Sequence, residues 1–314
     1  MGIALIITYA ICMLFIMVFS LVQLNLAIVY NKAQKTTLSD NTQKNYPDFP
    51  LVTIQLPLYN EKYVVKRLLD AVIKINWPID KIEIQILDDS TDETSDIIQK
   101  TLIEEKFCNL DILHIKRQNR QGYKAGALQL GMQVSKGEFI AIFDADFIPS
   151  KSFLYDTVKE FENPAIGMVQ TKWEHLNKDY SLLTRLQAFG LNGHFRVEQT
   201  GRNEAGSFIN INGTAGVWRK SCIDEAGGWQ ADTLTEDLDL SYRAQLKGWK
   251  FKYLEQIHSP SELPVIMSAV KSQQYRWTKG GAETAKKNLG NVFRTKLDLK
   301  NKIHAFFHLT NSVN

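Results

Sequence analysis

The longest hydrophobic run of the chain lies at its N-terminus. Residues 1–31 contain no charged side chain, and residues 3–30 are mostly Ile, Leu, Val, Ala, Met and Phe. A membrane-spanning helix needs about 20 such residues, so the sequence predicts a transmembrane helix over residues 1–31. A secretory signal peptide fits poorly, because the run has no basic leader, is too long and lacks a small-x-small cleavage site. Lys32 and Lys35 follow directly, which favours a cytoplasmic location for the rest of the chain.

After residue 50, short apolar runs alternate with segments of helical periodicity. Apolar runs predict strands at residues 51–58, 82–87, 110–115, 139–143 and 165–170. Apolar residues at helical spacing predict helices at residues 61–75, 90–107 and 122–134. The helix that starts at Ser90 is expected to open with a capping box, Ser-Thr-Asp-Glu. Alternation of this kind is typical of an α/β fold with a mainly parallel sheet covered by helices.

The same pattern divides the chain into four parts. Polar residues and two prolines predict a linker over residues 32–50, and residues 51–262 form the predicted α/β domain. Residues 263–314 begin with an amphipathic, basic and aromatic segment of the kind that lies in a membrane interface. A new apolar run starts at His304, so we expect further membrane helices beyond Asn314.

Composition and charge change this picture little. The 314 residues are 44% hydrophobic and 23% charged, with a formal net charge of +3. This is enough for one large domain or two small ones, and we expect no nucleic-acid partner. The cysteines, Cys12, Cys108 and Cys222, follow no metal-binding or disulfide spacing, which predicts a reducing compartment.

Polar side chains follow four of the predicted strands, at the point where each strand ends. These side chains are Asn60 and Glu61, then Asp88 and Asp89, then those of residues 117–124, then Asp144 and Asp146. In parallel sheets, ligands bind outside the carboxyl ends of the strands. The sequence therefore predicts one binding site at this edge of the sheet.

Asp144 and Asp146 end the most apolar of these strands. Positions i and i+2 of an extended chain point to the same side, so both carboxylates can reach one ligand. Two like charges at this place repel each other unless a positive charge lies between them. A divalent cation such as Mg²⁺ or Mn²⁺, held also by the phosphates of a substrate, would supply that charge. A solvated strand end is the alternative for an isolated Asp-x-Asp.

The glycine-rich segment 121–128 has two interpretations. Its glycines would let the backbone approach a diphosphate near a helix N-terminus, with Lys124 adding positive charge. It could equally be an ordinary loop with a solvated lysine, and it lacks the spacing of a Walker A loop. Asp88 and Asp89 likewise could be acids of a first helical turn, where the helix dipole favours them.

Three motifs lie in the second half of the chain. Residues 211–219 form a small-residue turn that permits close approach of a ligand to the backbone. Thr235 is a candidate N-cap, with Glu236 and Asp237 in the first helical turn, where acids are favoured in any case. Residues 273–277, Gln-Gln-Tyr-Arg-Trp, are by themselves typical of a membrane-interface anchor.

Four motifs occur in a fixed order along the chain. They are Asp88-Asp89-Ser90, Asp144-Ala145-Asp146, Thr235-Glu236-Asp237 and Gln273-x-x-Arg276-Trp277. Together, with a membrane helix before them and a basic interfacial segment after them, they resemble family 2 of the inverting glycosyltransferases. This family includes the cellulose, chitin, hyaluronan and mannan synthases. The segments 88–92, 170–173 and 212–216 look most like the plant-type mannan and glucan synthases of the cellulose-synthase-like class, whereas cellulose synthases proper usually show Asp-Asp-Gly.

The resemblance implies a GT-A-type domain that binds a nucleotide sugar, and it assigns donor-binding roles. Asp88 and Asp89 would hold the donor nucleoside, and Lys124 would contact the donor diphosphate. Asp144 and Asp146 would bind the donor through Mg²⁺ or Mn²⁺, which neutralises charge on the leaving nucleoside diphosphate.

The resemblance also implies the catalytic and acceptor-binding residues. Asp237 would be the general base that takes a proton from the acceptor hydroxyl, with inversion and no covalent intermediate. Gln273, Arg276 and Trp277 would close over the diphosphate and the acceptor. The acceptor would lie along Asn212, Gly213, Thr214 and the indole of Trp277.

The implied function is that of a membrane-bound, metal-dependent, inverting β-hexosyltransferase. It would transfer a hexose from UDP-glucose or GDP-mannose to a growing β-glucan or mannan, at the cytoplasmic face of a bacterial inner membrane or a Golgi membrane. One alternative is transfer of a single glucose to a lipid acceptor of the ceramide type. Another is a membrane-anchored binding protein without activity, which the presence of Asp144, Asp146 and Asp237 together disfavours.

Overall fold

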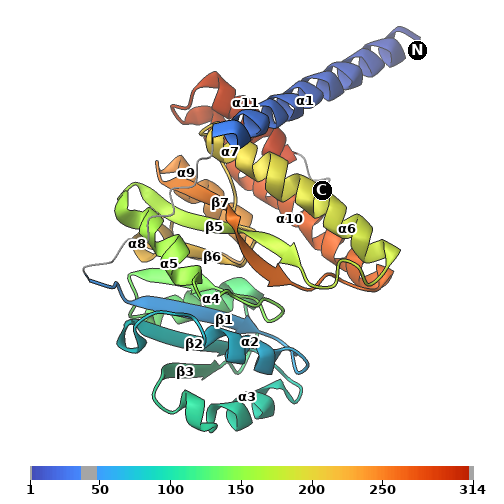
Figure 1. Ribbon diagram of the computed structural model, residues 1–314. Helices are drawn as coiled ribbons and strands as arrows, with labels where there is room; N and C mark the ends of the chain where they lie inside the picture. Colours follow the sequence, from blue (N-terminus) through green and yellow to red (C-terminus); the bar gives the residue numbers. More distant parts are fainter. Residues whose placement is uncertain (1, 37–47, 311–314) are drawn as a thin grey trace.

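The apolar runs of the first half of the chain form four parallel strands of a seven-stranded sheet. The computed structural model describes residues 2–36 and 48–310. The strands are β1 (Val52–Leu58), β2 (Ile82–Asp88), β3 (Asp111–Lys116) and β4 (Phe139–Ile142). They lie in the order β3-β2-β1-β4, and each neighbouring pair is parallel (Figure 1). Their carboxyl ends therefore meet at one edge, and the predicted α/β fold with a mainly parallel sheet is confirmed.

Three further strands extend the sheet beyond β4. They are β5 (Ile166–His175), β6 (Gly216–Arg219) and β7 (Lys250–Ser261), in the order β4-β6-β5-β7. β6 runs antiparallel to both of its neighbours, whereas β5 and β7 are parallel. The register pairs Ile142, the last residue of β4, with Gly216, the first residue of β6. The turn that precedes β6 therefore lies beside the end of β4.

Helices cover both faces of the sheet. One face carries α2 (Val65–Val72), α3 (Thr94–Leu102) and α5 (Phe153–Val158), and the other carries α4 (Tyr123–Val134), α8 (Lys220–Glu225) and α9 (Glu236–Leu246). Alternate side chains of β4 enter the two cores: Phe139 and Ala141 lie in the first, Ile140 and Ile142 in the second. Short 3-10 turns are η1 (Ile79–Lys81), η2 (Glu105–Phe107) and η3 (Lys159–Glu162).

Two predicted elements differ in detail from the observed ones. The predicted capping box is wrong, because α3 begins only at Thr94. The backbone N–H of Thr94 donates a 3.0 Å hydrogen bond to Oδ1 of Asp92. The hydroxyl of Ser90 instead accepts a hydrogen bond from the backbone N–H of Asn60. β5 extends five residues beyond the predicted 165–170, because it pairs with β7 as far as His175.

A second group of helices packs beside the sheet. α6 (Leu182–Gly193) continues without a break into the π-helical turn η4 (His194–Gln199) and α7 (Thr200–Glu204). The amphipathic segment predicted near the C-terminus is α10 (Met267–Arg294), which packs against α9 and α11 (Leu299–Thr310). The membrane-interface position of α10 stays a prediction.

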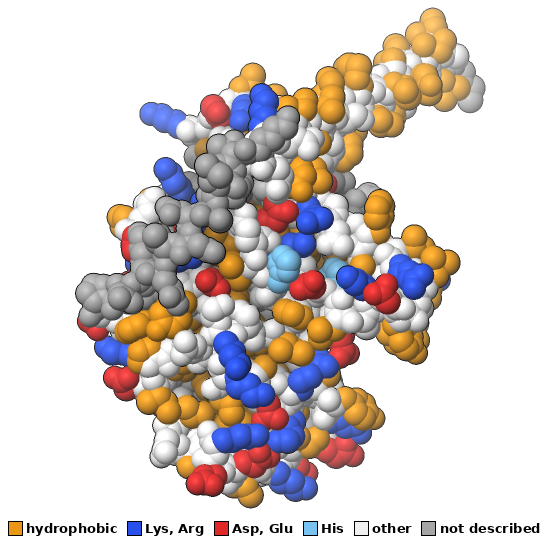
Figure 2. Space-filling model, in the orientation of Figure 1, with side chains coloured by type: hydrophobic (Ala, Val, Ile, Leu, Met, Phe, Trp, Pro, Cys, Tyr) orange, Lys and Arg blue, Asp and Glu red, His pale blue; other side chains and the backbone are white. Residues whose placement is uncertain are grey.

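The apolar N-terminal run forms one long helix, α1 (Gly2–Thr36), which projects from the body of the protein (Figure 1). Residues Gly2–Gln34 are long and apolar enough to cross a membrane, and hydrophobic side chains cover the projecting part (Figure 2). Near its C-terminal end the helix packs on η4, α7 and α11, where Leu26 is fully buried. α1 includes the first residues of the predicted linker, and residues 37–47 lie outside the described part.

Candidate active site

Lys124 joins three separate parts of the chain at the carboxyl edge of the sheet. Its ammonium forms an ion pair with Asp144, just after β4, and donates a 2.9 Å hydrogen bond to the carbonyl of Gly213. The hydroxyl of Thr214 accepts a 2.8 Å bond from the backbone N–H of Asp144. α4, the end of β4 and the turn before β6 are therefore fixed to one another. The strand-end argument predicts that Lys124 and Asp144 lie at one edge, but it does not include the turn before β6.

The turn before β6 also approaches Asp237 of α9. Gly213 has a φ of +76°, a conformation that residues with a Cβ rarely adopt. A Cβ built on Gly213 would lie 3.3 Å from Oδ2 of Asp237 and 3.4 Å from Nζ of Lys124. A glycine is thus required for the backbone to pass between these two side chains.

Four carboxylates lie near Lys124, and burial together with repulsion from neighbouring acids raises the pKa values of three of them, Asp146, Glu236 and Asp237. Burial and the charge of Asp144 raise the pKa of Asp146 to about 6. Burial and the neighbouring Glu236 raise the pKa of Asp237 to about 7. Burial lowers the pKa of the Lys124 ammonium, but Asp144 and Glu236 outweigh burial and the net shift is upward. The cluster therefore favours any positive charge that enters it.

Glu61 belongs to the same acidic region, although no role was predicted for it. Burial and the charges of Asp146 and Asp144 raise its pKa to about 7. Its place directly after the end of β1 was the only sequence signal. That signal places Glu61 at the predicted binding edge, beside Asn60, but gives it no individual role.

α10 brings the Gln-x-x-Arg-Trp motif to the acidic cluster. A Cβ built on Gly280 would lie 2.5 Å from Cγ2 of Thr235, so the backbone of α10 packs directly on the start of α9. Arg276 lies one turn earlier, and its charge lowers the pKa of Glu236 against the larger upward effect of burial. Gln273 and Trp277 are half-buried and one turn apart on the same helix.

The side chain of Thr235 does not cap α9, contrary to the predicted N-cap role. It occupies the N-cap position without a capping hydrogen bond. Its hydroxyl instead lies 3.2 Å from the hydroxyl of Thr284 in α10. Packing against a neighbouring helix has therefore replaced local capping.

Asp88 is fully buried and bound by three donors of the protein itself. It accepts hydrogen bonds from the backbone N–H of Ser90 (2.8 Å) and the hydroxyl of Ser95 (2.6 Å), and Nε2 of His114 lies 3.0 Å away. Burial raises the pKa of Asp88, but the hydrogen bonds from His114, Ser95 and Ser90 outweigh it and hold the pKa well below its usual range. Asp88 thus links β2, β3 and α3.

Asp89 forms a two-pronged ion pair with Arg117, a residue for which no individual role was predicted. Nε of Arg117 lies 2.6 Å from Oδ1 of Asp89, and Nη2 contacts Oδ2. The same guanidinium donates 2.8 Å hydrogen bonds to the carbonyls of Gln121 and Tyr123. Asp89 therefore holds the glycine-rich segment 121–128 in place through Arg117.

The side chain of Asn212 faces away from the carboxylates. Its carbonyl oxygen accepts hydrogen bonds from the amides of Asn210 (2.8 Å) and Gln199 (3.3 Å), and its amide nitrogen lies 3.4 Å from Nε2 of His194. Of the predicted acceptor-binding turn, Gly213 and Thr214 therefore lie at the cluster, while Asn212 contacts η4.

Asp144 and Asp146 fit a site for Mg²⁺ or Mn²⁺ that is completed by substrate. Carboxylate oxygens are the ligands that these hard cations prefer. Within residues 2–36 and 48–310, no group of three or more acidic, His or Cys side chains is arranged to hold a metal alone. Two carboxylates leave most coordination positions open, so phosphate oxygens and water would have to supply the other ligands.

Comparison with known protein families agrees with the four motifs. The model of glycosyl transferase family 2 matches residues 53–224, and that of glycosyl transferase family group 2 matches residues 139–311. The first match includes the motifs at residues 88–90 and 144–146, and the second includes those at residues 144–146, 235–237 and 273–277.

Similar proteins of known sequence include plant enzymes. The chain is 44% identical over 265 residues to the probable glucomannan 4-beta-mannosyltransferase 4 of Oryza sativa subsp. japonica. It is 42% identical over 264 residues to the glucomannan 4-beta-mannosyltransferase 7 of Arabidopsis thaliana. Each alignment covers 82% of this chain and 48% of the relative, so the chain spans about half the length of these relatives.

Solved structures share the fold at low sequence identity. The mannosyltransferase PcManGT of Pyrobaculum calidifontis, solved in complex with GDP-Man and Mn²⁺, superposes with a TM-score of 0.71 at 18% identity, over 95% of this chain and 83% of that one. Residues 1–349 of S. aureus TarS, in complex with UDP-GlcNAc, give a TM-score of 0.61 at 15% identity, over 83% and 72% of the two chains. With its motifs, fold and relatives in agreement, the chain belongs to glycosyl transferase family 2, as its resemblance to the cellulose-synthase-like members predicts.

Proposed function

We propose that the protein is a metal-dependent, inverting β-glycosyltransferase that transfers a hexose from a nucleotide sugar to a growing β-linked polysaccharide. The observation that carries this proposal is the convergence of Asp144, Asp146 and Asp237 around Lys124 and the Gly213 turn. A base, a pair of metal ligands and a phosphate-binding cation are the parts that such a transfer requires.

The relatives favour mannose as the sugar. The plant proteins that are 42–44% identical to this chain are named glucomannan 4-beta-mannosyltransferases, and the PcManGT structure holds GDP-Man and Mn²⁺. We therefore place GDP-mannose before UDP-glucose as donor, and a β-mannan or glucomannan as product. The activity proposed is that of the whole protein, of which the chain is expected to form the catalytic part.

Asp237 is the proposed general base. A carboxylate in water has a pKa near 4 and is a weak base at neutral pH, whereas the raised pKa of about 7 brings Asp237 close to the working pH. Asp237 takes the proton of the acceptor hydroxyl as that oxygen attacks the anomeric carbon from the face opposite the leaving group. The bond to the nucleoside diphosphate breaks in the same step, and an α-linked donor gives a β-linked product.

Lys124 and the two aspartates after β4 are the proposed phosphate-binding group. Lys124 lies between Asp144 and Gly213, where its charge can contact the donor diphosphate. Asp144 and Asp146 would hold Mg²⁺ or Mn²⁺, which supplies positive charge to the leaving nucleoside diphosphate when bound. The raised pKa of Asp146, about 6, supports this assignment, because burial and the charge of Asp144 disfavour its ionised form and a bound cation would offset both effects.

The nucleoside is proposed to bind at the ends of β1 and β2. Asp89 and Arg117 form its polar edge, and Asp88, whose oxygens already have donors within the protein, holds the end of β2 in place. Arg120 packs flat on the ring of Tyr59, with Cζ 3.3 Å from the ring centroid. Together these side chains offer both hydrogen-bonding and stacking surface.

The acceptor is proposed to approach between the Gly213 turn and α10. Trp277 offers an aromatic platform for a sugar ring, while Gln273 and Arg276 close over the diphosphate. Gly213 lines the path with its backbone. Thr214 is fully buried and ties the turn to Asp144 through its hydroxyl, and Asn212 supports the turn through His194. The contact of Gly280 with Thr235, two residues before Asp237, supports this arrangement.

We propose that α1 anchors the catalytic domain at the cytoplasmic face of a bacterial inner membrane or a Golgi membrane. The length and apolar surface of Gly2–Gln34 support this. The basic and aromatic residues of α10 would then lie at the membrane surface.

The test is transfer by the full-length protein in membranes, with GDP-mannose and UDP-glucose offered in parallel. Each donor is supplied with Mg²⁺ or Mn²⁺ and then with a chelator. Metal-dependent turnover into insoluble polysaccharide supports the proposal and identifies the sugar. A lipid-extractable product would instead indicate single transfer to a lipid, and binding of either donor without any turnover would indicate an inactive binding protein.

A further inference from the structure

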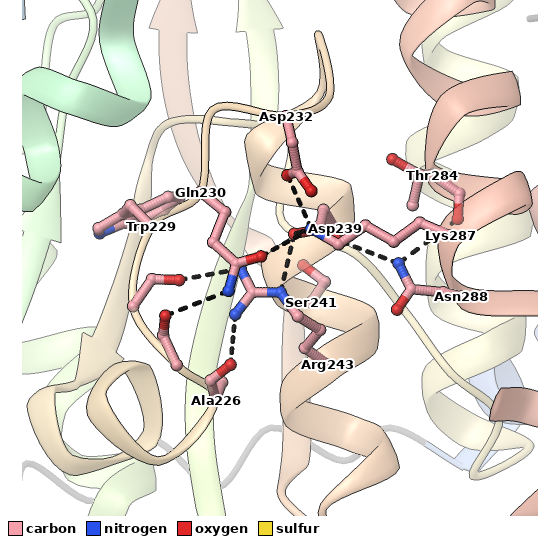
Figure 3. Close-up of polar contacts among 12 residues, drawn as sticks. Ala226, Trp229, Gln230, Asp232, Asp239, Ser241, Arg243, Thr284, Lys287 and Asn288 are labelled. Carbon is pink, nitrogen blue, oxygen red and sulfur yellow. Dashed lines mark hydrogen bonds and ion pairs between the residues drawn. The ribbon is translucent and has the colours of Figure 1, made fainter. Parts of the chain in front are cut away.

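Asp239 is a fully buried acid of α9 to which the proposed reaction gives no role. Its Oδ2 lies 2.8 Å from Nε of Arg243 and 3.0 Å from Nζ of Lys287, and its Oδ1 accepts a 2.8 Å hydrogen bond from Asn288. Arg243 belongs to α9, whereas Lys287 and Asn288 belong to α10 (Figure 3). One carboxylate therefore joins the two helices that carry Asp237 and Trp277.

The same group of contacts includes the loop between α8 and α9. Nζ of Lys287 lies 2.7 Å from both Oε1 of Gln230 and Oδ1 of Asp232 (Figure 3). Arg243 donates hydrogen bonds to the carbonyls of Ala226 and Gly228. The charges of Asp232 and Asp239 thus balance those of Arg243 and Lys287. Each of the two cations bonds both to α9 and to the loop between α8 and α9.

We infer that Asp239 is a positioning residue for glycosyl transfer, which sets α9 against α10 and so fixes the base Asp237 relative to Trp277. This inference rests on the proposed function. Asp239 follows Asp237 by two residues on α9, so any rotation or slide of α9 moves both. Lys287 follows Trp277 by ten residues on α10, a distance of about 15 Å along the helix.

A second contact shows that α9 and α10 pack closely against each other. The backbone of α10 meets α9 at Gly280 and Thr235, where a methyl group would not fit. The Gly280 contact sets how near the helices lie. The two bonds of Asp239 to α10, from Lys287 and Asn288, set their rotation and register, because hydrogen bonds are directional whereas close packing alone permits sliding.

A buried ion pair that only stabilises the fold is the alternative. Removing one partner of such a pair destabilises a protein whether or not the pair positions a site. The chain offers a matched control in Glu83, a buried acid at the start of β2, at the opposite edge of the sheet from the acidic cluster. Glu83 binds the hydroxyl of Thr53 (2.5 Å) and the backbone N–H of Lys136 (3.0 Å).

The experiment compares Asp239→Asn with Glu83→Gln in the full-length protein. Each change removes one charge with little change of volume. We measure kcat, the KM of the donor that is turned over, the melting temperature, and hydrogen exchange of the amides of residues 273–280. For Asp239→Asn we expect kcat to fall by about tenfold to a hundredfold, since misplacement by about 1 Å costs this much. The donor KM should change less than about twofold, and exchange in α10 should become faster.

The double variant Asp239→Asn/Asn288→Asp supplies a rescue test. It exchanges acid and amide across the hydrogen bond between the helices, and retains one negative charge near Lys287. We expect it to recover most of the kcat lost in Asp239→Asn. If Asp239→Asn does not fold, Lys287→Gln is judged by the same criteria. It removes the ammonium that contacts Asp239, Asp232 and Gln230, on a side chain that is 25% exposed.

The inference is overturned if the Asp239 variant loses no more kcat than Glu83→Gln, or if exchange at residues 273–280 is unchanged. Hydrogen exchange needs no substrate, so it tests the helix placement even if the wild-type protein transfers no sugar. Absence of transfer by the wild type would count against the proposed function. Normal transfer by Asp239→Asn would count against this inference alone.

Discussion

The backbone of Gly280 in α10 lies against the side chain and backbone of Thr235, the residue that precedes α9. A Cβ on Gly280 would come within 2.5 Å of Cγ2 and 2.8 Å of the backbone nitrogen of Thr235. The second of these atoms cannot move without shifting the start of α9. Two motifs that lie about forty residues apart in the sequence therefore share one tight contact.

Gly280→Ala should consequently lower kcat by about tenfold or more, because it pushes α10 away from Asp237. Gly290→Ala is the matched control on the same helix, since a Cβ there meets no atom within 4 Å. That variant should keep its activity and gain about 0.5–1 kcal/mol of unfolding free energy. Steady-state kinetics and urea unfolding check both, and equal kinetics in the two variants would show that the contact has no bearing on transfer.

Asp237→Asn should abolish transfer and leave donor binding nearly unchanged. In the wild type, kcat should rise as the pH increases through about 7, because the base acts only when ionised. The measurement is a pH profile of kcat together with donor titration of the variant. Loss of donor binding in Asp237→Asn would contradict the assignment of this residue as the base.

The same substitution should stabilise the fold above neutral pH. The pKa of Asp237 is raised in the folded protein, so the folded state binds the proton more tightly than the unfolded state, whose pKa is near 3.9. The contribution of this group to stability is therefore present below about pH 4 and is lost as the pH rises through 7. Asp237→Asn should exceed the wild type by on the order of 1–2 kcal/mol at pH 8 and by much less at pH 4, measured by urea unfolding.

Asp146→Asn should weaken donor binding only when a divalent cation is present. We expect a loss of about tenfold or more in affinity, or about 1.4 kcal/mol, with Mn²⁺ and little change with chelator. Calorimetric titration with GDP-mannose or UDP-glucose measures this. An equal loss under both conditions would mean that Asp146 acts on the donor without a metal.

Asp88→Ala should destabilise the domain by about 2–4 kcal/mol, because three donors lose their buried partner. The pKa of Asp88 is depressed in the folded protein, so its stabilising effect is present above the unfolded pKa near 3.9 and is lost as the pH falls below it. The stability difference between wild type and variant should therefore shrink in acid. Unfolding in urea at pH 7 and pH 3 tests the direction.

Much of the fold could be predicted because its signals are local. β4 is a continuous apolar run, β1 and β2 carry apolar residues at alternate positions, and each of the three is followed by polar residues at the edge where the site lies. β6 could not be predicted in this way. It is four residues long, and its direction is set by pairing with β4 and β5, which no local pattern records.

The residue types of the site could also be predicted, but not all of their partners. Asp88 and Asp89 are adjacent and chemically identical, yet the first binds Ser95 and His114 while the second binds Arg117. These partners are set by the packing of β3 and the glycine-rich segment against β2. Asp239 was overlooked for a related reason: its contacts with Lys287 and Asn288 join helices about fifty residues apart.

The antiparallel strand β6 has a consequence for how the protein folds. It pairs with β4 through Gly216 and Ile142 and with β5 through Trp218 and Met168, so its place in the sheet depends on contacts between segments that are distant in the sequence. Contacts between such distant residues form late, because long loops must close first. The turn at Gly213 is held by β6, and we expect it to be among the last parts to assemble. We therefore expect the hydrogen bond between Lys124 and the Gly213 carbonyl to form only late in folding.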